Sequence, residues 1–346
     1  MTTASRPIWG LQVRLRIGLV GLGHAWEKRH RPALCALADR FEVRAVCDPV
    51  SHRAELAASE FGATAVDGFQ VLVRREDVDA VLILSSGWYG SAPILAACEA
   101  GKAVYLGGGF DVSLDDAREI KRRVEATGVV FVAEFPRRES PATLRLQELI
   151  ATVLGAPRLI FCHRRLPVAN PSGCGPRPAA QPSTIQELVG LVDWCCYVVG
   201  RAPKRVTGMT WSGAGCGQDY RMMSLDFSEG AQPGMGPIAQ LSCGRYIPAQ
   251  WSEAVTYRPL AAMQISCEHG IAFVDLPATL IWFDQAGRHQ ESLESESPVG
   301  EQLLTRFYRA VTAPVGRTHD LDDAYRALFI VEQAGKSHRE GRRIEL

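Results

Sequence analysis

The chain has 346 residues, which is long enough for two domains, and 47% of them are hydrophobic, which suffices for two buried cores. Its 38 basic and 38 acidic residues leave no net charge, so the composition argues against nucleic-acid binding. No apolar run is long enough to span a membrane. The segment Met1–Gln12 lacks a basic start followed by an apolar stretch, so we expect no signal peptide and a cytoplasmic location. The ten cysteines form no Cys-x-x-Cys pair, which predicts reduced cysteines and no metal site.

Short β-rich runs alternate with helical patterns between Leu15 and Phe135. This alternation predicts a parallel sheet with crossover helices. The expected strands are Arg16–Val20, Val43–Cys47, Ala80–Leu84, Ala103–Leu106 and Val129–Ala133. The expected helices are Arg53–Phe61, Ser91–Ala100 and Ser113–Thr127, the last with Ser113 as its N-cap.

The second half of the chain has a different pattern, in which strands separated by short turns favour antiparallel pairing. The expected strands are Arg158–Arg165, Val206–Trp211, Arg221–Phe227, Ile238–Cys243, Met263–Cys267, Ile271–Asp275 and Thr279–Phe283. The expected helices are Ala142–Leu154, Thr184–Val199 and Asp320–Arg339. The stretch Pro167–Ser183 is predicted to be a long loop.

A glycine-rich segment follows the first expected strand. Gly21 allows a tight turn, and Gly23 lets the backbone approach a pyrophosphate at the N-terminus of the next helix. Trp26 stands at the place of the third glycine of this fingerprint, so we expect it to swing out or to push the helix away. Asp48 ends the second strand, where a carboxylate binds a ribose 2′-OH and repels a 2′-phosphate, and Pro49 supplies no cation. The segment predicts bound NAD, with NADP less favoured; the alternative is a similar sheet with an empty crevice.

Seven short segments, in their order and spacing, resemble the glucose–fructose oxidoreductase / inositol dehydrogenase (Gfo/Idh/MocA) family over roughly Leu15 to Leu346. They are Gly21-x-Gly23, Cys47–Pro49, Val78–Ile83, Cys98–Val104, Phe135–Ala142, Asp323–Leu328 and Arg339–Arg343. The resemblance implies an α/β protein with an N-terminal Rossmann domain, here 14–136, built on a parallel sheet. It implies a C-terminal α/β domain, 137–346, with an open antiparallel sheet that often forms the oligomer interface. The last helix is a candidate for packing back on the N-terminal domain.

The resemblance also implies oxidation or reduction of a sugar or related polyol, by hydride transfer with a nicotinamide cofactor. The residues expected at the cofactor are Gly21, Gly23, His24, Ala25, Trp26, Asp48, Ser85, Ser86, Gly87, Gly107 and Gly108.

Two glycines depart from the family pattern. Gly108 stands where the family has the lysine of Glu-Lys-Pro, and Gly190 stands where it has a catalytic histidine, three residues before Asp193. Glycine exchanges no proton, which argues against the ordinary sugar dehydrogenase reaction. Three functions remain open: an oxidoreductase with a different acid–base group, an inactive sensor or regulatory partner that binds a dinucleotide or metabolite, and an NAD-retaining enzyme with a non-redox step.

Three residues are candidates for the missing acid–base group. Asp193 matches a site residue of the family, with a structural hydrogen bond as its alternative role. Glu187 lies about one helical turn from Gly190, with an exposed surface carboxylate as the alternative. Strand alternation puts His163 and Arg165 on one face, where they would bind a carboxylate or phosphate; a solvated or interface face is the alternative.

Three further residues are candidates for binding a small, sugar-like substrate. Trp88 and Tyr89 follow the fourth strand, at the edge of the sheet where ligands bind. They would stack on the nicotinamide or on a sugar; the alternative is that they line the cleft as packing. Arg138 would touch a substrate anion or form an ion pair that bridges the domains. We also expect a homo-oligomer through the C-terminal sheet, whose uncovered face would carry apolar residues such as Met263, Ile265 and Trp282 or their strand neighbours.

Overall fold

The structure is a computed structural model that describes residues 14–85, 89–168, 183–213, 218–230, 232–248, 251, 253–257, 260–293, 298–313 and 320–346. The chain divides into two compact units. The first comprises Met1–Gly107, Arg123–Val132 and Gly300–Thr318, and the second comprises Gly108–Arg122, Ala133–Val299 and His319–Leu346. No helix within the described residues combines the length and apolar character that a bilayer crossing needs.

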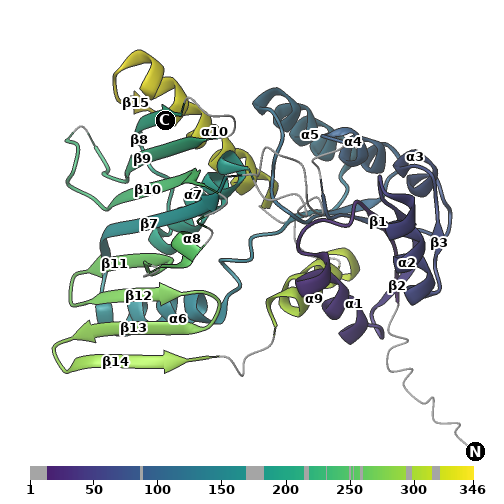
Figure 1. Cartoon of the computed structure of the whole chain (residues 1–346), viewed down its shortest axis with the longest axis horizontal. Helices are drawn as coiled ribbons and strands as arrows, with labels where there is room; N and C mark the ends of the chain where they lie inside the picture. Colours follow the sequence, from purple (N-terminus) through teal and green to yellow (C-terminus); the bar gives the residue numbers. More distant parts are fainter. Residues whose placement is uncertain are drawn as a thin grey trace, which may run out of the picture. The chain divides into compact units, whose positions relative to one another are not determined.

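The first unit is built on a six-stranded parallel sheet in the order β3-β2-β1-β4-β5-β6 (Figure 1). The strands are β1 (Leu15–Val20), β2 (Phe41–Cys47), β3 (Thr64–Ala65), β4 (Ala80–Ile83), β5 (Ala103–Leu106) and β6 (Phe131–Ala133). Every residue of β4 and β5 is buried, because a parallel sheet of this kind is covered on both faces. The predicted parallel sheet and its five longer strands are confirmed, whereas the two-residue β3 was missed.

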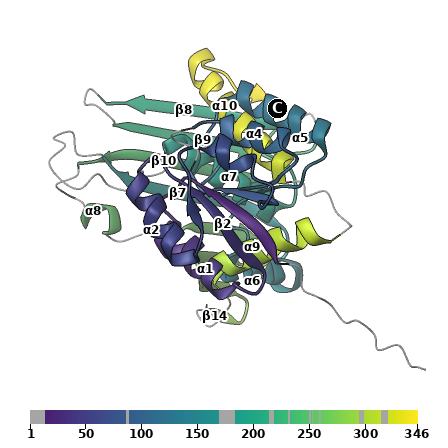
Figure 2. The ribbon, with the colours of Figure 1, turned by 90° about the vertical axis from the view of Figure 1, so that its right-hand side faces the viewer.

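Helices flank this sheet, with α3 and α4 on one side and α1 and α9 on the other (Figure 1, Figure 2). Their bounds are η1 (Trp26–His30, a π-helix), α1 (Arg31–Ala36), α2 (Ser51–Phe61), α3 (Phe69–Val73), α4 (Ala92–Glu99), α5 (Leu114–Thr127) and α9 (Val299–Thr312). The residues of α5 up to Arg122 are counted with the second unit. The Ser113 hydroxyl accepts a hydrogen bond from the Asp116 amide (3.1 Å), which confirms it as the N-cap of α5. The sequence analysis missed α9, although it closes the core of this unit through a contact between Phe307 and Tyr105.

The second unit is built on a nine-stranded sheet in the order β14-β13-β12-β11-β7-β10-β9-β8-β15. The strands are β7 (Pro157–Pro167), β8 (Arg205–Ser212), β9 (Asp219–Asp226), β10 (Ile238–Ile247), β11 (Met263–Cys267), β12 (Ile271–Asp275), β13 (Thr279–Asp284), β14 (Gly287–Ser292) and β15 (Ile344–Glu345). The sheet is mixed rather than purely antiparallel as expected, because β10 pairs with β7 in parallel. A parallel pair needs a long connection, and here α7, β8 and β9 supply it.

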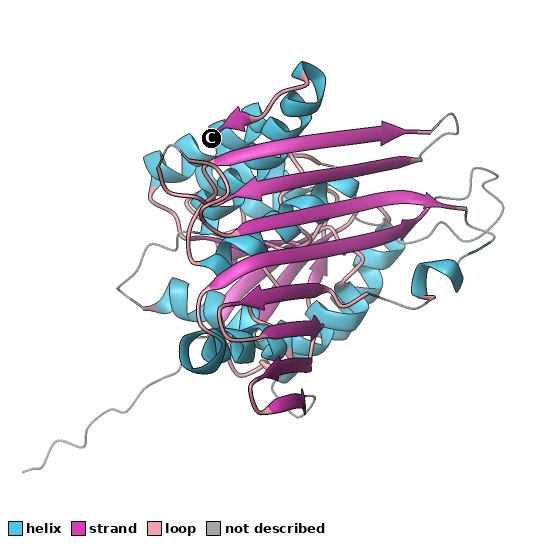
Figure 3. Ribbon diagram, turned by 90° about the vertical axis from the view of Figure 1, so that its left-hand side faces the viewer, coloured by secondary structure: helices cyan, strands magenta, loops and turns pink. Residues whose placement is uncertain are grey.

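One face of this sheet is covered by helices and the other is open, as Figure 3 shows. The helices of the unit are α6 (Pro141–Leu149), η2 (Ile150–Leu154, a π-helix), α7 (Thr184–Val199), α8 (Glu253–Thr256) and α10 (Asp320–Glu340). The predicted helix over Ala142–Leu154 is thus split between α6 and η2. The last helix, α10, packs on β8 and on α7, which belong to the same unit.

Apolar side chains occupy both faces of this sheet. Met263, Ile265 and Trp282 are buried on the helix-covered side, so the expectation that they lie on the open face is wrong. The open face instead carries the side chains that alternate with these along the same strands or along neighbouring strands. Such strand neighbours were the alternative expectation. The exposed members are Leu159, Phe161, Met209, Trp211 and Phe283.

Candidate functional site

The loop between β1 and η1 passes directly against the end of β4. A Cβ atom on Gly23 would lie 2.2 Å from the Leu84 carbonyl oxygen, and one on Gly21 would lie 3.0 Å from that of Ser85. Side chains at either position would therefore force the strands apart. The two glycines thus allow the loop to pack closely on the end of β4, as the tight turn of the predicted dinucleotide site requires.

Trp26 does not swing out into solvent, which was one of the two positions expected for it. The indole is buried, and it contacts the Phe61 ring of α2 edge to face, with 6.0 Å between centroids. The helix begins as a π-turn at this point, since the Arg31 amide donates to the Trp26 carbonyl five residues earlier. We infer that the wider turn accommodates the indole where the fingerprint has glycine. His24 is exposed at the start of this turn, and Ala25 is buried.

Asp48 connects the glycine-rich loop to the end of β2. Its buried carboxylate accepts hydrogen bonds from the amides of Leu22 (2.7 Å) and Val50 (2.9 Å). The Arg53 guanidinium lies 3.8 Å from the same carboxylate and donates to the Leu22 carbonyl. Arg53 is the cation that the sequence analysis overlooked: it lies in α2 rather than directly after the acid, and a helix beginning near Ser51 was the signal that could have revealed it.

The segment after β4 is described only in part. Ser85 is half-buried beside Gly21, while Ser86, Gly87 and Trp88 lie outside the described residues. The Tyr89 ring contacts Phe69 edge to face at 5.2 Å, and its hydroxyl lies 3.7 Å from the Cys47 sulfur. Burial raises the pKa of Tyr89. In the first unit Tyr89 therefore serves packing, and its predicted contact with substrate stays a prediction.

The glycine run after β5 adopts backbone conformations that a lysine would resist. Gly107 ends the strand with a hydrogen bond to the Ile83 carbonyl (2.8 Å). Gly108 and Gly109, which belong to the second unit, have φ values of 80° and 90°, a region that L residues rarely adopt. A Cβ atom on Gly109 would lie 2.6 Å from the side-chain nitrogen of Gln186 in α7. The loop is thus shaped for glycine and filled by Gln186.

Arg137 occupies the space beside Gly190, where the resemblance places a histidine. A Cβ atom on Gly190 would lie 2.4 Å from an Arg137 guanidinium nitrogen. That guanidinium forms an ion pair of 2.5 Å with Glu187, one turn earlier on α7, and Arg164 of β7 approaches the same carboxylate to 3.7 Å. The Glu187 side chain is 12% exposed, so it is no solvated surface carboxylate. Neither Arg137 nor Arg164 was among the predicted site residues, because tertiary contacts alone reveal their approach to Glu187.

Asp193 is held by Arg138 within the same unit. The Arg138 guanidinium donates to both carboxylate oxygens of Asp193 and to Asp323 of α10 (2.9 Å). The Asp193 side chain is only 2% exposed. Burial raises the pKa of Asp193 to about 6, although Arg138 acts in the opposite direction, and the pKa of Arg138 is raised by its two acidic partners. At neutral pH this arrangement is a buried ion pair that links α7, α10 and the segment after β6.

His163 lies on the opposite face of the sheet from these groups. Its ring nitrogens contact the Ser242 hydroxyl (2.7 Å) and the Tyr246 hydroxyl (3.3 Å). Arg165 shares this open face, as alternation predicted, and donates to the Tyr257 carbonyl (3.0 Å). Burial lowers the pKa of His163. The structure therefore places Glu187 and Asp193 on the same helix, α7, with different arginine partners, and separates His163 and Arg165 from them.

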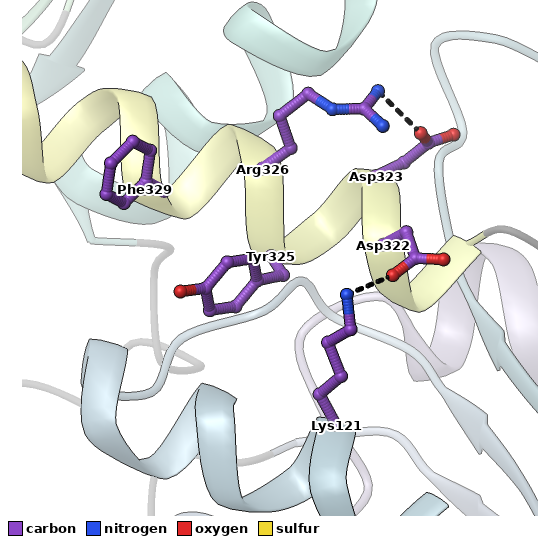
Figure 4. A pocket seen from close by; sticks show the side chains of 6 residues that line it. All are labelled: Lys121, Asp322, Asp323, Tyr325, Arg326 and Phe329. Atoms are coloured by element: carbon purple, nitrogen blue, oxygen red, sulfur yellow. Dashed lines mark hydrogen bonds and ion pairs between the residues drawn. The ribbon is translucent and has the colours of Figure 1, made fainter. Parts of the chain in front are cut away.

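A surface groove lies between α5 and α10 of the second unit (Figure 4). Its lining residues are Lys121, Asp322, Asp323, Tyr325, Arg326 and Phe329. Two ion pairs already engage its charges, Lys121 with Asp322 (2.6 Å) and Arg326 with Asp323 (3.0 Å). Asp323 connects this groove to the candidate residues through its hydrogen bond from Arg138. Within the described residues no cluster of acidic, histidine or cysteine side chains suits a metal ion.

The six-stranded parallel sheet with its glycine-rich loop defines the first unit as a dinucleotide-binding Rossmann fold. Residues 15–135 match the family described as "Oxidoreductase family, NAD-binding Rossmann fold" (GFO_IDH_MocA). This match covers the Rossmann domain of the first unit and identifies that domain as one of the Gfo/Idh/MocA oxidoreductase family.

Two curated relatives illustrate the similarity. Inositol 2-dehydrogenase 3 of Saccharopolyspora erythraea is 30% identical over 176 residues, which cover 50% of this chain and 52% of the relative. D-xylose 1-dehydrogenase (NADP(+)) 2 of Haloferax volcanii is 28% identical over 227 residues, which cover 63% and 67%. The chain spans about half the length of the inositol dehydrogenases that it matches, with 52% and 46% for two of them.

Solved structures show the same fold over nearly the whole chain. Aldose–aldose oxidoreductase from Caulobacter crescentus superposes with a TM-score of 0.80 at 15% identity, and covers 96% of this chain and 100% of its own. UDP-N-acetylglucosamine 3-dehydrogenase from Acidithiobacillus ferrooxidans superposes with a TM-score of 0.75 at 20% identity, with coverages of 94% and 98%.

Proposed function

We propose that the protein is an NAD-dependent oxidoreductase that acts on a sugar-like or other small polar substrate. The observation that carries this proposal is the glycine-rich loop of the first unit, which Asp48 binds through the Leu22 amide and in which Gly21 and Gly23 have no room for a side chain. These residues fit the pyrophosphate and ribose of a dinucleotide. When bound, the nicotinamide ring accepts or donates the hydride. The names of the relatives, inositol and xylose dehydrogenases, support a polyol or sugar as substrate.

Glu187 is the group that we propose for proton exchange with the substrate hydroxyl. Oxidation of a carbinol releases a proton, and neither Gly108 nor Gly190 can accept it. Glu187 is a partly exposed carboxylate on the same helix as Gly190, whereas the Asp193 oxygens are both engaged by Arg138. Arg137 holds the Glu187 carboxylate in position and places a positive charge beside Gly190, where it stabilises a developing alkoxide oxygen.

The preference for NAD over NADP rests on Asp48. A carboxylate at the end of β2 repels the 2′-phosphate of NADP. Arg53, 3.8 Å from that carboxylate, acts in the opposite direction, but its charge is shared with Asp48. We therefore expect NAD to bind more tightly.

Cofactor binding and turnover test the proposal separately. Calorimetric titration of the full chain with NAD and with NADP is expected to show tighter binding of NAD. Formation of reduced nicotinamide is then followed by absorbance across a panel of aldoses, polyols, sugar acids and sugar phosphates, with NAD present. Binding without turnover on any of them would contradict the enzyme and favour a sensor, and equal or tighter binding of NADP would contradict the preference.

We also propose that the protein is a cytoplasmic homo-oligomer. The eight described cysteines are free, which supports a reducing compartment. The apolar side chains on the open face of the second sheet support assembly through that face.

A further inference from the structure

Four arginines converge on the helix-covered face of the second sheet, and we call them the arginine cluster: Arg137, Arg164, Arg221 and Arg245. Arg164 and Arg221 are the cross-strand neighbours of Cys243 on its two sides, in β7 and β9. Residues in register share a face, and the contact of Arg164 with Glu187 identifies this face as the one that α7 covers. Arg245 stands two residues further along β10, on the same face.

Arg137 belongs to the cluster through its ion pair with Glu187. Its guanidinium lies against Gly190 and binds the Glu187 carboxylate, which Arg164 also approaches. The charges of Glu187, Arg164, Arg137 and Asp219 all act on the buried Cys243 thiol, whose pKa burial raises to about 12. The cluster and Gly190 are therefore parts of one neighbourhood within the second unit.

Positive charge exceeds negative charge in this neighbourhood. Within the described part of the chain, the strand positions and contacts above place two carboxylates beside the four guanidinium groups, those of Glu187 and Asp219. Asp219, the neighbour of Arg245, also accepts a hydrogen bond from the Thr184 hydroxyl at 2.9 Å. The Nε atom of Arg221 is buried and has no hydrogen-bond partner among the described residues. Like charges at neighbouring positions on one sheet face repel each other, and the buried Arg221 donor adds to the cost.

A bound anion would reduce the repulsion between the guanidinium groups and accept a hydrogen bond from the buried Arg221 donor. Guanidinium groups bind carboxylates and phosphates through paired, charge-assisted hydrogen bonds. We propose that the arginine cluster binds an anionic group, a carboxylate or a phosphate, carried by the substrate of this enzyme. The assignment of the anion to a substrate rests on the proposed function; the anion site itself does not. The assignment of the anion to a substrate predicts that this substrate is an acidic sugar or a phosphate ester rather than a neutral polyol.

A matched pair of ligands tests the proposal on the full chain, without cofactor. D-Glucuronate differs from D-glucose by a carboxylate in place of the C6 hydroxymethyl group, and inorganic phosphate supplies the anion alone. Calorimetry is expected to detect binding of glucuronate or of phosphate but not of glucose. Which of the two anions binds more tightly distinguishes a carboxylate site from a phosphate site. Failure of both anions to bind would overturn the proposal.

Substitutions locate the site. Arg164 is half exposed, so Arg164→Gln is expected to fold, and loss of one charge-assisted contact should weaken anion binding by about tenfold or more. Arg288→Gln is the matched control, because Arg288 is an exposed arginine of β14 in the same unit. Arg164→Lys, which keeps the charge but not the paired geometry, should fall between the wild type and Arg164→Gln. Equal binding by Arg164→Gln, Arg288→Gln and the wild type would overturn the proposal, even if anions bind.

The two proposals fail in different ways. Anion binding that depends on Arg164, without hydride transfer to any substrate, would leave the anion site standing and contradict the oxidoreductase. Hydride transfer with neutral polyols that neither phosphate nor glucuronate inhibits would leave the oxidoreductase standing and contradict the anion site.

Discussion

At the level of single residues, Glu187 is the side chain on which turnover is expected to depend. Glu187→Gln keeps the shape and a hydrogen-bond acceptor for Arg137 but removes the proton acceptor. We expect kcat to fall by about 10²–10⁴, the usual contribution of a general acid or base. We also expect the pH profile of kcat to change, because the variant lacks the carboxylate that accepts the proton.

Glu229→Gln is the control for this substitution. Glu229 is an exposed carboxylate of the same unit that pairs with Arg201, and its loss should leave kcat and the pH profile unchanged. A Glu187→Gln variant with an unaltered pH profile would assign Glu187 a structural role.

Protonation of Asp193 is expected to make the free energy of unfolding depend on pH. Its pKa is raised from 3.8 to about 6 by burial, so the folded state binds this proton more tightly than the unfolded state. The contribution of Asp193 to the free energy of unfolding should therefore be greatest below about pH 4 and decline as the pH rises to about 6. A shift of this size corresponds to at most about 3 kcal/mol, since one pKa unit is about 1.4 kcal/mol.

Asp193→Asn separates this effect from the ion pair. The variant should lose the decline between about pH 4 and 6, as measured by urea unfolding at several pH values. Because asparagine mimics the protonated carboxylate and Arg138 keeps Asp323 as a charged partner, the variant should also lack the loss of up to about 3 kcal/mol that the wild type shows at neutral pH. A variant that retains the decline would show that another group causes it.

At the level of elements, α7 and its glycine determine where Arg137 lies. In Gly190→Ala the new Cβ atom would stand 2.4 Å from the Arg137 guanidinium, which is the mobile end of a long side chain and would move away. We therefore expect a change in unfolding free energy within about 1 kcal/mol, because alanine favours the helix, but a loss of activity of about tenfold or more.

Gly335→Ala provides the matched comparison on α10, where the nearest atom to a Cβ is Arg339 Nη1 at an ordinary 3.5 Å. It should raise stability by up to about 1 kcal/mol and leave activity unchanged. Similar activities for the two alanine variants would argue against a role for Arg137 at Gly190.

The elements with strong local signals were predicted well from the sequence. The ranges of β5, β11, β12 and α7 agree residue for residue, since alternation or capping marks their ends. The short α3 and β3 carry no such signal, and α9 lies far along the chain from the sheet that it covers. The parallel pairing of β7 with β10 depends on a contact between distant segments, which periodicity cannot reveal.

The candidate site could be predicted from the sequence only at positions that local spacing marks. The glycine-rich loop, Asp48, Glu187 and the shared face of His163 and Arg165 follow from spacing. Spacing does not show which sheet face a helix covers, and for that reason His163 was grouped with Glu187 while Arg164 was passed over. The contact of Arg137 with Gly190 joins residues from two segments and has no local signature.

At the level of the whole molecule, the open sheet face predicts assembly. Phe161 and Trp211 are 39% and 49% exposed on that face, and apolar surface of this kind is normally covered by a partner. Light scattering at micromolar concentration should give at least twice the chain mass of 37.8 kDa. The double variant Phe161→Lys/Trp211→Lys should be monomeric.

Leu56→Lys is the control for the charge added at an exposed apolar site, because Leu56 is 59% exposed but belongs to the first unit. Its mass should match that of the wild type. A wild-type mass equal to that of one chain would refute the assembly.

The contact between Arg137 and Gly190 also has an evolutionary consequence. A histidine at position 190 would collide with the guanidinium that stands there, and a shorter residue at position 137 would remove the closer of the two arginines that contact Glu187, leaving Arg164 at 3.7 Å. Restoring the family's histidine is therefore unfavourable unless residue 137 changes as well. Such epistasis would hold a lineage to glycine at position 190 for as long as Arg137 stands beside it, whatever its substrate became.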